Sequence, residues 1–430
     1  MPFLFTCLAE KIASPDRCRI FALVAVFATS GSGQTYKLLL KGGHVIDPSN
    51  RVDAVRDVAI DGDLVAAIGQ DIPADRADTV IDVSGLYVTP GLVDIHAHFY
   101  VTPQVGTAYE ASSSVDPDTT CPRTCVTTAV DVGTVGWRAF PDFRKRIIEK
   151  ARKTRVLAML NIVGMGMVNY DVEQNLADMQ PEETADMASR NADVVVGIKS
   201  AHWRQPNFES VDRAVEAAEL AGVPVMVDFG YFLPDRPYQT MVLDRLRSGD
   251  MSTHFYRWPA PLLDESGQKL PYLDAARGRG VKFDVGHGAG SFHFRLAEPL
   301  VRQGFWPDSI STDLHINSHN GAMIDMVTVM SKFLAMGMPL AEVVLRSTAN
   351  PAGQILRQEL GQIAVGAEAD IAVLRVDSGE FGYVDVLGGR ITGDRRIGCE
   401  MTLRAGEIVF DYNGRAGTPW RDADIDYPGR

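Results

Sequence analysis

Between residues 89 and 360, the sequence alternates short apolar runs of β character with stretches of helical periodicity. In residues 210–221, for example, apolar side chains recur three or four positions apart and so lie on one helical face. The apolar runs cover residues 92–95, 126–130, 156–160, 194–198, 223–227, 251–253, 281–285 and 309–312. Eight parallel strands joined by crossover helices close most naturally into a (β/α)8 barrel, an α/β fold of the TIM-barrel type. The alternative is an open doubly wound sheet, but no glycine-rich phosphate loop follows the first run.

Short β-like segments flank this region on both sides. They cover residues 38–40, 44–46, 55–60, 64–68, 80–83, 86–88, 369–374, 385–387, 401–403 and 408–410. Lys41-Gly42-Gly43 indicates a tight turn between residues 38–40 and 44–46, and Asp61-Gly62-Asp63 indicates one between residues 55–60 and 64–68. We therefore expect one small β-sandwich domain built from both chain ends, residues 34–88 and residues 361–430 with the tail, beside a barrel of residues 89–360.

The first 33 residues differ from the rest of the chain. Lys11, Arg17 and Arg19 precede a nine-residue apolar run, residues 20–28, which small residues follow. This pattern predicts a secretory signal peptide at residues 1–33, because the apolar run is shorter than the roughly 20 residues that span a bilayer. We expect cleavage within residues 30–34 and an exported protein, periplasmic or extracellular, with no membrane attachment. If the segment instead packs on the fold as an arm, the protein is cytoplasmic.

The composition excludes some classes of partner. The net charge is −13, and basic residues are mixed among acidic ones with no basic stripe. A nucleic acid is therefore not an expected partner. Five cysteines are too few for a disulfide framework. Cys121 and Cys125 are candidates for one disulfide in an oxidising compartment, and the alternative is two free thiols. The sequence leaves the oligomeric state open, a homo-oligomer included.

Four of the expected strands end in side chains that bind metals or move protons. In a barrel, the C-terminal ends of the strands form the active site. His96 and His98 end the first strand, and alternate residues of a strand point to the same face, so two nitrogen ligands can converge on one metal ion. Lys199 ends the fourth strand, His254 the sixth and Asp313 the eighth. Each residue alone has a structural explanation, but the four strand ends together predict a metal centre.

The order of these residues around eight strands resembles that of the amidohydrolase superfamily of metal-dependent hydrolases. Residues 126–131, 283–292 and 309–315 are similar to the amidohydrolase/deacetylase branch, which is related to dihydroorotases and D-aminoacylases. The resemblance covers most of the chain after residue 33, including the β domain and the return into that domain at residues 361–374.

The resemblance implies a role for each of these residues. His96 and His98 hold the more buried metal, and His254 binds the second one. Lys199 carries CO2 as a carbamate, which turns an ammonium into a carboxylate that bridges two cations. Asp313 ligates the first metal, takes a proton from the bridging water and hands it to the leaving group. We expect one or two zinc ions per subunit, and Mn2+ and Fe2+ also suit such ligands.

The fifth strand departs from the superfamily pattern, because Asp228 stands where a histidine is usual. Asp228 can bind zinc through oxygen, or His202 can supply the missing nitrogen; the third alternative is a single metal ion. His287 lies between glycines, which let the backbone approach a ligand closely, and so is a candidate catalytic donor to a substrate carbonyl or carboxylate. The alternative is a histidine packed in its own loop.

The resemblance implies a metal-dependent hydrolase that cleaves an amide or ester bond by attack of metal-activated hydroxide. The branch favours a deacylase, such as a deacetylase, of a small carboxylate-bearing substrate. A dihydroorotase-like cyclic amidohydrolase is the alternative within the superfamily. A non-catalytic barrel scaffold is the alternative of another class: Asp228 alone favours it, and Lys199 and Asp313 argue against it, because a scaffold does not require them.

Overall fold

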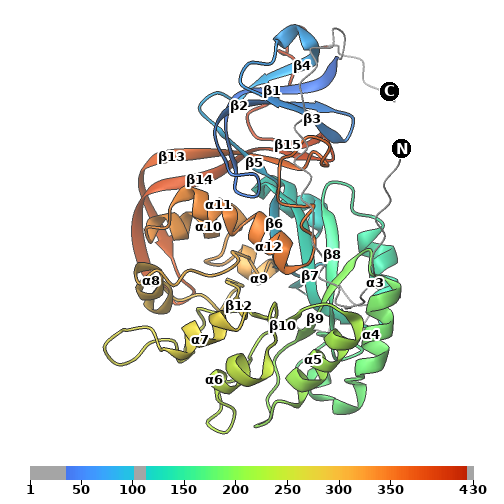
Figure 1. The fold of residues 1–430 in the computed structure, drawn as a ribbon, viewed down its shortest axis with the longest axis vertical. Coiled ribbons are helices and arrows are strands. Elements are labelled where there is room, and N and C mark those ends of the chain that lie inside the picture. The colour runs from blue at the N-terminus through green and yellow to red at the C-terminus, as the bar shows by residue number, and fades with distance from the viewer. Residues whose placement is uncertain (1–34, 101–112, 424–430) are drawn as a thin grey trace, which may run out of the picture. The chain divides into compact units, whose positions relative to one another are not determined.

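The barrel strands follow one another in chain order in a parallel sheet (Figure 1). The computed structural model describes residues 35–100 and 113–423. The sheet comprises β6 (Leu92–Ala97), β7 (Val126–Gly136), β8 (Arg155–Asn161), β9 (Val195–Ser200), β10 (Val225–Val227), β11 (Met251–Ser252) and β12 (Lys282–Phe283). Residues 309–314 complete it, because Ser309 forms a parallel bridge with Asp284 and Leu314 forms one with Ala97. The predicted eight-stranded barrel is therefore confirmed, with isolated bridges in place of a regular eighth strand.

The barrel strands are apolar on both faces because both faces are buried. Every residue of β6, β9 and β10 is buried. Alternate side chains fill the interior, namely Val93, Ile95, Val130, Val132, Leu157, Met159, Val196, Met226 and Met251. Ala352, Ile355 and Leu360, in α12 (Ala349–Gln354) and just after it, pack against the same core. The interior is thus filled with side chains, which leaves the strand ends for chemistry.

Helical segments connect the strands. The α-helices besides α12 are α2 (Pro117–Thr120), α3 (Phe140–Phe143), α4 (Pro181–Arg190), α5 (Glu209–Ala221), α6 (Tyr238–Thr240), α7 (Tyr272–Gly278), α8 (Phe294–Arg302), α9 (Ile316–His319), α10 (Met326–Ala335) and α11 (Leu340–Leu345). The 3-10 turns are η1 (Ala74–Arg76), η2 (Cys121–Thr124), η4 (Val172–Gln174) and η5 (Leu176–Asp178), and η3 (Arg144–Ile148) and η6 (Met241–Arg245) are π-helical. α5 matches the predicted helix closely, and it ends at Gly222, whose φ of 70° is left-handed.

The two chain ends share a second sheet. Its order is β15-β14-β13-β5-β1-β2-β3, with β4 paired to β1. The strands are β1 (Tyr36–Asp47), β2 (Val52–Asp61), β3 (Leu64–Gly69), β4 (Ala77–Asp82), β5 (Tyr87–Pro90), β13 (Ile371–Val384), β14 (Arg390–Arg404) and β15 (Glu407–Asp411). Val88 of β5 pairs with Val373 of β13, which joins the N-terminal strands to the C-terminal ones. One small β domain from both chain ends is therefore present, as predicted.

Two local predictions in this domain are wrong. Lys41-Gly42-Gly43 is not a turn, because β1 runs through it with an irregular register. Gly42 has a φ of +77° and donates its N–H to Asp57 Oδ1 at 2.8 Å, so the glycine permits a bulge rather than a reversal. Residues 385–387 are not a strand: Asp385 accepts the N–H groups of Leu387 and Gly389 and forms the turn between β13 and β14.

One disulfide joins the barrel to the β domain. It links Cys125, directly before β7, to Cys399 in β14, whose Cα atoms are 5.5 Å apart. Neither alternative left open for Cys121 and Cys125 holds, because Cys125 bonds to Cys399 and only Cys121 is a buried free thiol. The predicted signal peptide, residues 1–33, lies outside the described residues. Within residues 35–100 and 113–423, no helix has the length and apolar character needed to cross a bilayer.

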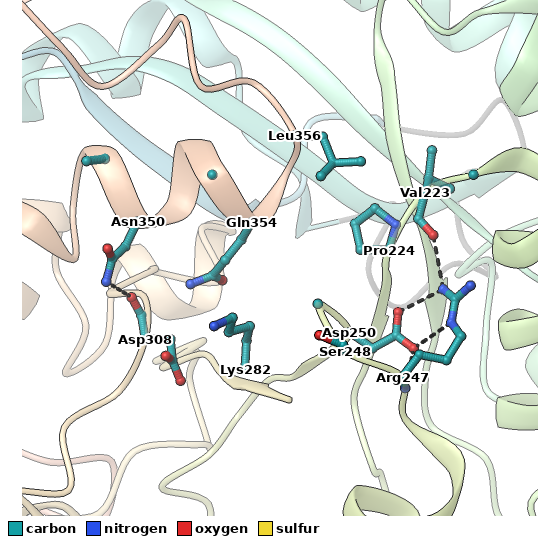
Figure 2. Close-up of a pocket in the computed structure, with 14 residues that line it drawn as sticks. Val223, Pro224, Arg247, Ser248, Asp250, Lys282, Asp308, Asn350, Gln354 and Leu356 are labelled. Atoms are coloured by element: carbon teal, nitrogen blue, oxygen red, sulfur yellow. Dashed lines mark hydrogen bonds and ion pairs between the residues drawn. The ribbon is translucent and has the colours of Figure 1, made fainter. Parts of the chain in front are cut away.

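A cavity of about 600 Å³ opens at the end of the barrel where the strands begin (Figure 2). Pro224, Asp250 and Lys282, at or before the starts of β10, β11 and β12, line one side, and Gln354 of α12 lines another. The cavity has a mixed polar and apolar lining and holds none of the predicted metal ligands. It therefore lies at the opposite end of the strands from the predicted chemistry.

Candidate metal centre

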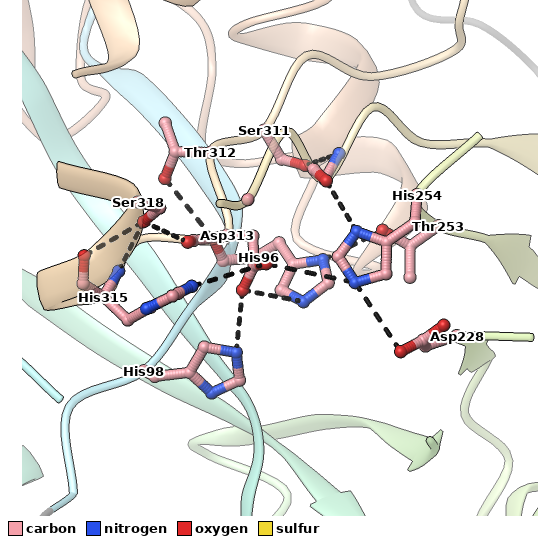
Figure 3. A network of polar contacts seen from close by, with 12 residues as sticks. His96, His98, Asp228, Thr253, His254, Ser311, Thr312, Asp313, His315 and Ser318 are labelled. Carbon is pink, nitrogen blue, oxygen red and sulfur yellow. Dashed lines mark hydrogen bonds and ion pairs between the residues drawn. The ribbon is translucent and has the colours of Figure 1, made fainter. Parts of the chain in front are cut away.

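The predicted ligands meet at the C-terminal end of the barrel (Figure 3). His96, His254 and Asp313 each offer one ligand atom, and these atoms lie within 4.8 Å of one another. His98 Nε2 is 3.0 Å from Asp313 Oδ1. Lys199 Nζ is 3.4 Å from His96 Nε2. All of these side chains are buried. Strands from four parts of the sequence thus bring their polar side chains together at one buried site.

The three imidazoles are held by their outer nitrogens. Each Nδ1 has a protein partner: Thr253 Oγ1 at 2.9 Å from His96, Thr134 Oγ1 at 2.7 Å from His98, and Gly286 O at 2.6 Å from His254. Thr253 in turn donates to Asp284 Oδ2 at 2.7 Å. Such bonds fix the tautomer and orientation of a ligand histidine. They leave the Nε2 atoms for the centre of the site.

The protonation states suit a cation. Burial lowers the pKa of His96 to about 3 and also lowers the pKa of His254, so these imidazoles are neutral near pH 7. Burial alone would raise the pKa of Asp313, but the neighbouring His96 and the hydrogen bond from His98 hold it well below its ordinary value. Neutral imidazole nitrogens and an ionised carboxylate are the ligands that zinc binds in proteins. The donor set therefore fits a divalent metal ion.

Two ligand positions have unusual backbone conformations. His254 has a φ of +54° and Asp313 a φ of +51°, both in the left-handed region that disfavours side chains. Gly288 packs against Asp313 so closely that an added Cβ would lie 2.4 Å from Asp313 Oδ2. Strained backbone of this kind costs free energy and persists only where the surroundings impose it, which is common at functional sites.

Asp228 lies beside this centre rather than in it. Its Oδ2 is 3.2 Å from His202 Nε2 and 3.7 Å from His254 Nε2, and its Oδ1 is 3.3 Å from Arg257 Nη1. His202 Nδ1 is 3.0 Å from Glu173, so His202 lies between two buried carboxylates. Burial would raise the pKa of Asp228, but His254, His202 and Arg257 hold it far below its ordinary value.

Glu173 was not among the predicted site residues. It lies in η4, in the connection that follows β8, and only the fold brings it to His202. Nothing in its sequence surroundings distinguishes it from the many surface acids of the chain, because neither a strand end nor a motif marks it. Its burial beside an imidazole is what sets it apart.

His287 has both ring nitrogens engaged within its own surroundings. Nδ1 donates to Gly288 O at 2.9 Å, and Nε2 accepts from Lys332 Nζ at 2.7 Å. The ring stacks on Phe292 with 4.5 Å between centroids, and burial lowers the pKa of His287 well below its ordinary value. His287 therefore contacts its own loop and Lys332 of α10 in this structure, and its role as a donor to a substrate stays a prediction.

Comparisons with known proteins find relatives over most of the chain. A deacetylase of Agrobacterium fabrum is 32% identical over 344 residues, which cover 77% of this chain and 81% of that protein. A solved structure of an adenine deaminase has a TM-score of 0.79 at 27% identity, and the match covers 87% of this chain and 100% of that one. A dihydroorotase structure has a TM-score of 0.74 at 28% identity, with 87% and 99% covered. No family model matches the sequence.

A closed parallel barrel with imidazoles and a carboxylate converging at its strand ends defines a metal-dependent hydrolase. With these relatives, the chain belongs to the amidohydrolase superfamily and is an enzyme that acts on carbon–nitrogen bonds. Membership of this superfamily, which the sequence predicts, is thereby confirmed. The alternative of a non-catalytic scaffold is not confirmed.

Proposed function

We propose that the enzyme is a deacylase that removes an acyl group, such as acetyl, from a small carboxylate-bearing compound. The observation that carries this proposal is the convergence of His96, His254 and Asp313 within 4.8 Å at the strand ends. The 32% identity to a deacetylase over most of both chains supports the choice of reaction. The substrate is a small molecule, since the site is buried among the barrel strands.

The side chains divide the work of hydrolysis. A divalent cation, which we propose is zinc, would lower the pKa of a bound water to about 7 and polarise the scissile carbonyl. His96, His98, His254 and Asp313 would hold it, and Lys199, 3.4 Å from His96 Nε2, would join them as a carbamate. Asp313 is ionised and buried, so it accepts the proton of the attacking water and returns it to the leaving nitrogen or oxygen.

We propose that the site holds one metal ion rather than two. Asp228, the residue in place of the usual histidine, already has His202 at 3.2 Å from one oxygen and Arg257 at 3.3 Å from the other. Glu173 lies 3.0 Å from His202 Nδ1, so both ring nitrogens of His202 already face a carboxylate. Side chains therefore already contact both oxygens of Asp228, where a second metal would otherwise bind.

Metal analysis of the purified protein tests this stoichiometry. We expect about one equivalent of metal per subunit in the wild type and in the Asp228→Asn variant, because Asp228 is not a ligand of the proposed single ion. Two equivalents in the wild type, with one lost in Asp228→Asn, would show that Asp228 is a ligand and that the site is binuclear.

Activity is tested with a panel of N-acyl and O-acyl carboxylates in both stereochemical series, assayed alongside cyclic amides. We expect acyl hydrolysis, and Asp313→Asn should lower kcat by about 1000-fold because the proton acceptor is lost. Hydrolysis of the cyclic amides alone would favour the dihydroorotase-like alternative, for which the 28%-identical dihydroorotase structure is the support. Asp313→Asn with full activity would contradict the mechanism.

We propose that the protein is exported and that residues 1–33 are removed. The Cys125–Cys399 disulfide supports this, because such bonds persist in oxidising compartments and are rare in the cytosol. Expression of the full chain in a bacterium should give a periplasmic or secreted product. Its mass should correspond to a chain that begins within residues 30–34. A cytoplasmic product that retains Met1 would contradict the proposal.

A further inference from the structure

Three connections at the C-terminal end of the barrel place an arginine between two tyrosines. Arg204 follows β9, Tyr170 follows β8 and Tyr231 follows β10. The Arg204 guanidinium carbon lies 4.5 Å from the Tyr170 ring centroid and 5.4 Å from the Tyr231 ring centroid. The Tyr170 ring lies 5.3 Å from the His202 ring, and Asp228 lies 3.2 Å from His202 and 3.7 Å from His254, so contacts connect the cluster to the metal centre.

The backbone around Arg204 is fixed on both sides. Gln174 donates from Nε2 to His202 O at 3.0 Å and accepts from the Arg204 N–H at 2.9 Å. Gly230, with a φ of +70°, approaches so closely that an added Cβ would lie 3.1 Å from His202 Cα. Hydrogen bonds and close packing therefore fix the backbone that carries the Arg204 guanidinium.

The charge of Arg204 is not neutralised by the described residues. Its Nε is buried without a hydrogen-bond partner among them. Asp171 is 4.0 Å away, at the limit of an ion pair, and is 98% exposed. Arg138, at the end of another barrel strand, also lies over an aromatic ring, that of Trp137 at 4.1 Å, but its Nε donates to Asp178 at 2.5 Å. Arg204 thus differs from a comparable arginine in lacking a close carboxylate.

We propose that Arg204, flanked by Tyr170 and Tyr231, binds the carboxylate of the substrate. The two rings lie close to the guanidinium, and the N–H groups of an arginine side chain match a carboxylate bidentately. This inference rests on the proposed deacylase function and assigns the residue that selects for charged substrates.

The test compares N-acetyl amino acids with their neutral primary amides. The wild type should prefer the carboxylate member of each pair. Arg204→Gln should lower kcat/KM for the carboxylates by about tenfold to 100-fold, mainly through KM, because a charge-assisted bond to the substrate is lost. It should leave kcat/KM for the amides unchanged. Arg204→Lys keeps the charge without the planar fork and should retain part of the preference.

Arg138→Gln is the matched control and should leave the carboxylate preference at the wild-type value. A fall in kcat/KM for both members of the pair in Arg204→Gln and Arg204→Lys would indicate a structural role and overturn the inference. An unchanged carboxylate preference in both variants would overturn it as well. A wild type that hydrolyses neither carboxylate nor amide would instead refute the proposed deacylase function.

Discussion

The orientation of each ligand imidazole depends on one neighbouring group. His98 is an example, because its Nδ1 lies 2.7 Å from the hydroxyl of Thr134, a fully buried residue at the C-terminal end of β7. The Thr134 N–H is itself fixed by Asp131 Oδ1 at 3.1 Å. Two hydrogen bonds in series thus determine where His98 Nε2 points.

Removing the Thr134 hydroxyl should weaken metal binding without unfolding the barrel. Thr134→Val keeps the shape of the side chain but leaves His98 Nδ1 without its partner, so we expect metal affinity to fall by about tenfold to 100-fold. Competition with a chelator measures this affinity. Thr184→Val removes a buried hydroxyl that bonds to Gln180 O in α4, and it should leave affinity unchanged. Equal affinities in both variants would show that Thr134 does not orient His98.

The sequence predicts the residues that lie at strand ends but not their partners. His96, His98 and Asp313 are recognisable because strand periodicity and barrel topology bring strand ends together. Glu173 and Cys399 are not, because each partner is distant in sequence and no period or motif links the two. Cys399 lies 274 positions from Cys125, and only the packing of β14 beside the start of β7 makes them neighbours.

At the scale of secondary-structure elements, Lys332 joins α10 to the connection after β12 and to the end of β13. Lys332 Nζ lies 2.7 Å from His287 Nε2, 2.7 Å from Ala322 O and 2.8 Å from Val384 O. His287 belongs to the connection after β12, and Val384 ends β13. Burial lowers the pKa of Lys332 to about 7, although Asp385 and Asp325 oppose the change.

This buried lysine should make stability rise with pH. An unfolded lysine has a pKa of about 10.4, so between about pH 7 and 10 the unfolded chain binds a proton that folded Lys332 lacks. Stability then increases with pH across this window and is lost as pH falls through it, by up to about 1.4 kcal/mol per pH unit. Urea unfolding at pH 7.5 and 9 measures the slope.

Lys332→Met should reduce the increase in unfolding free energy between pH 7.5 and 9. This expectation holds even if the substitution changes the stability at a single pH. Exposed Lys150→Met is the control and should keep the wild-type slope. If Lys332→Met and the wild type gain equal stability from pH 7.5 to 9, Lys332 is charged in the folded protein throughout.

The β13–β14 hairpin shows why some elements resist prediction. The ends of these strands that join the β-domain core are continuously buried, and they were predicted at 369–374 and 401–403. Their outer halves are mostly exposed or half-buried and carry polar and glycine residues, so no apolar run marks them. Their pairing comes from backbone hydrogen bonds over a long register, from Ile371 with Leu403 to Val384 with Arg390.

At the scale of the whole molecule, the barrel and the β domain are joined covalently as well as by packing. The two cysteines of the Cys125–Cys399 bond are 274 positions apart, and the segment between them contains Lys199, His254 and Asp313 but not His96 and His98. Cross-linking so long a loop restricts the unfolded chain strongly, and the chain-entropy model gives about 5.6 kcal/mol for it. Reduction should therefore destabilise the fold although the two thiols stay buried.

Thermal unfolding with and without a strong reductant tests this contribution. We expect the melting temperature of the wild type to fall by several degrees on reduction, because a lower free energy of unfolding shifts the transition. The double variant Cys125→Ala and Cys399→Ala should melt like the reduced wild type and be insensitive to reductant. Cys121→Ala removes the buried free thiol and should keep the reductant-dependent shift. A wild-type melt that is unchanged after complete reduction, verified by thiol titration, would show that packing alone holds the two sheets together.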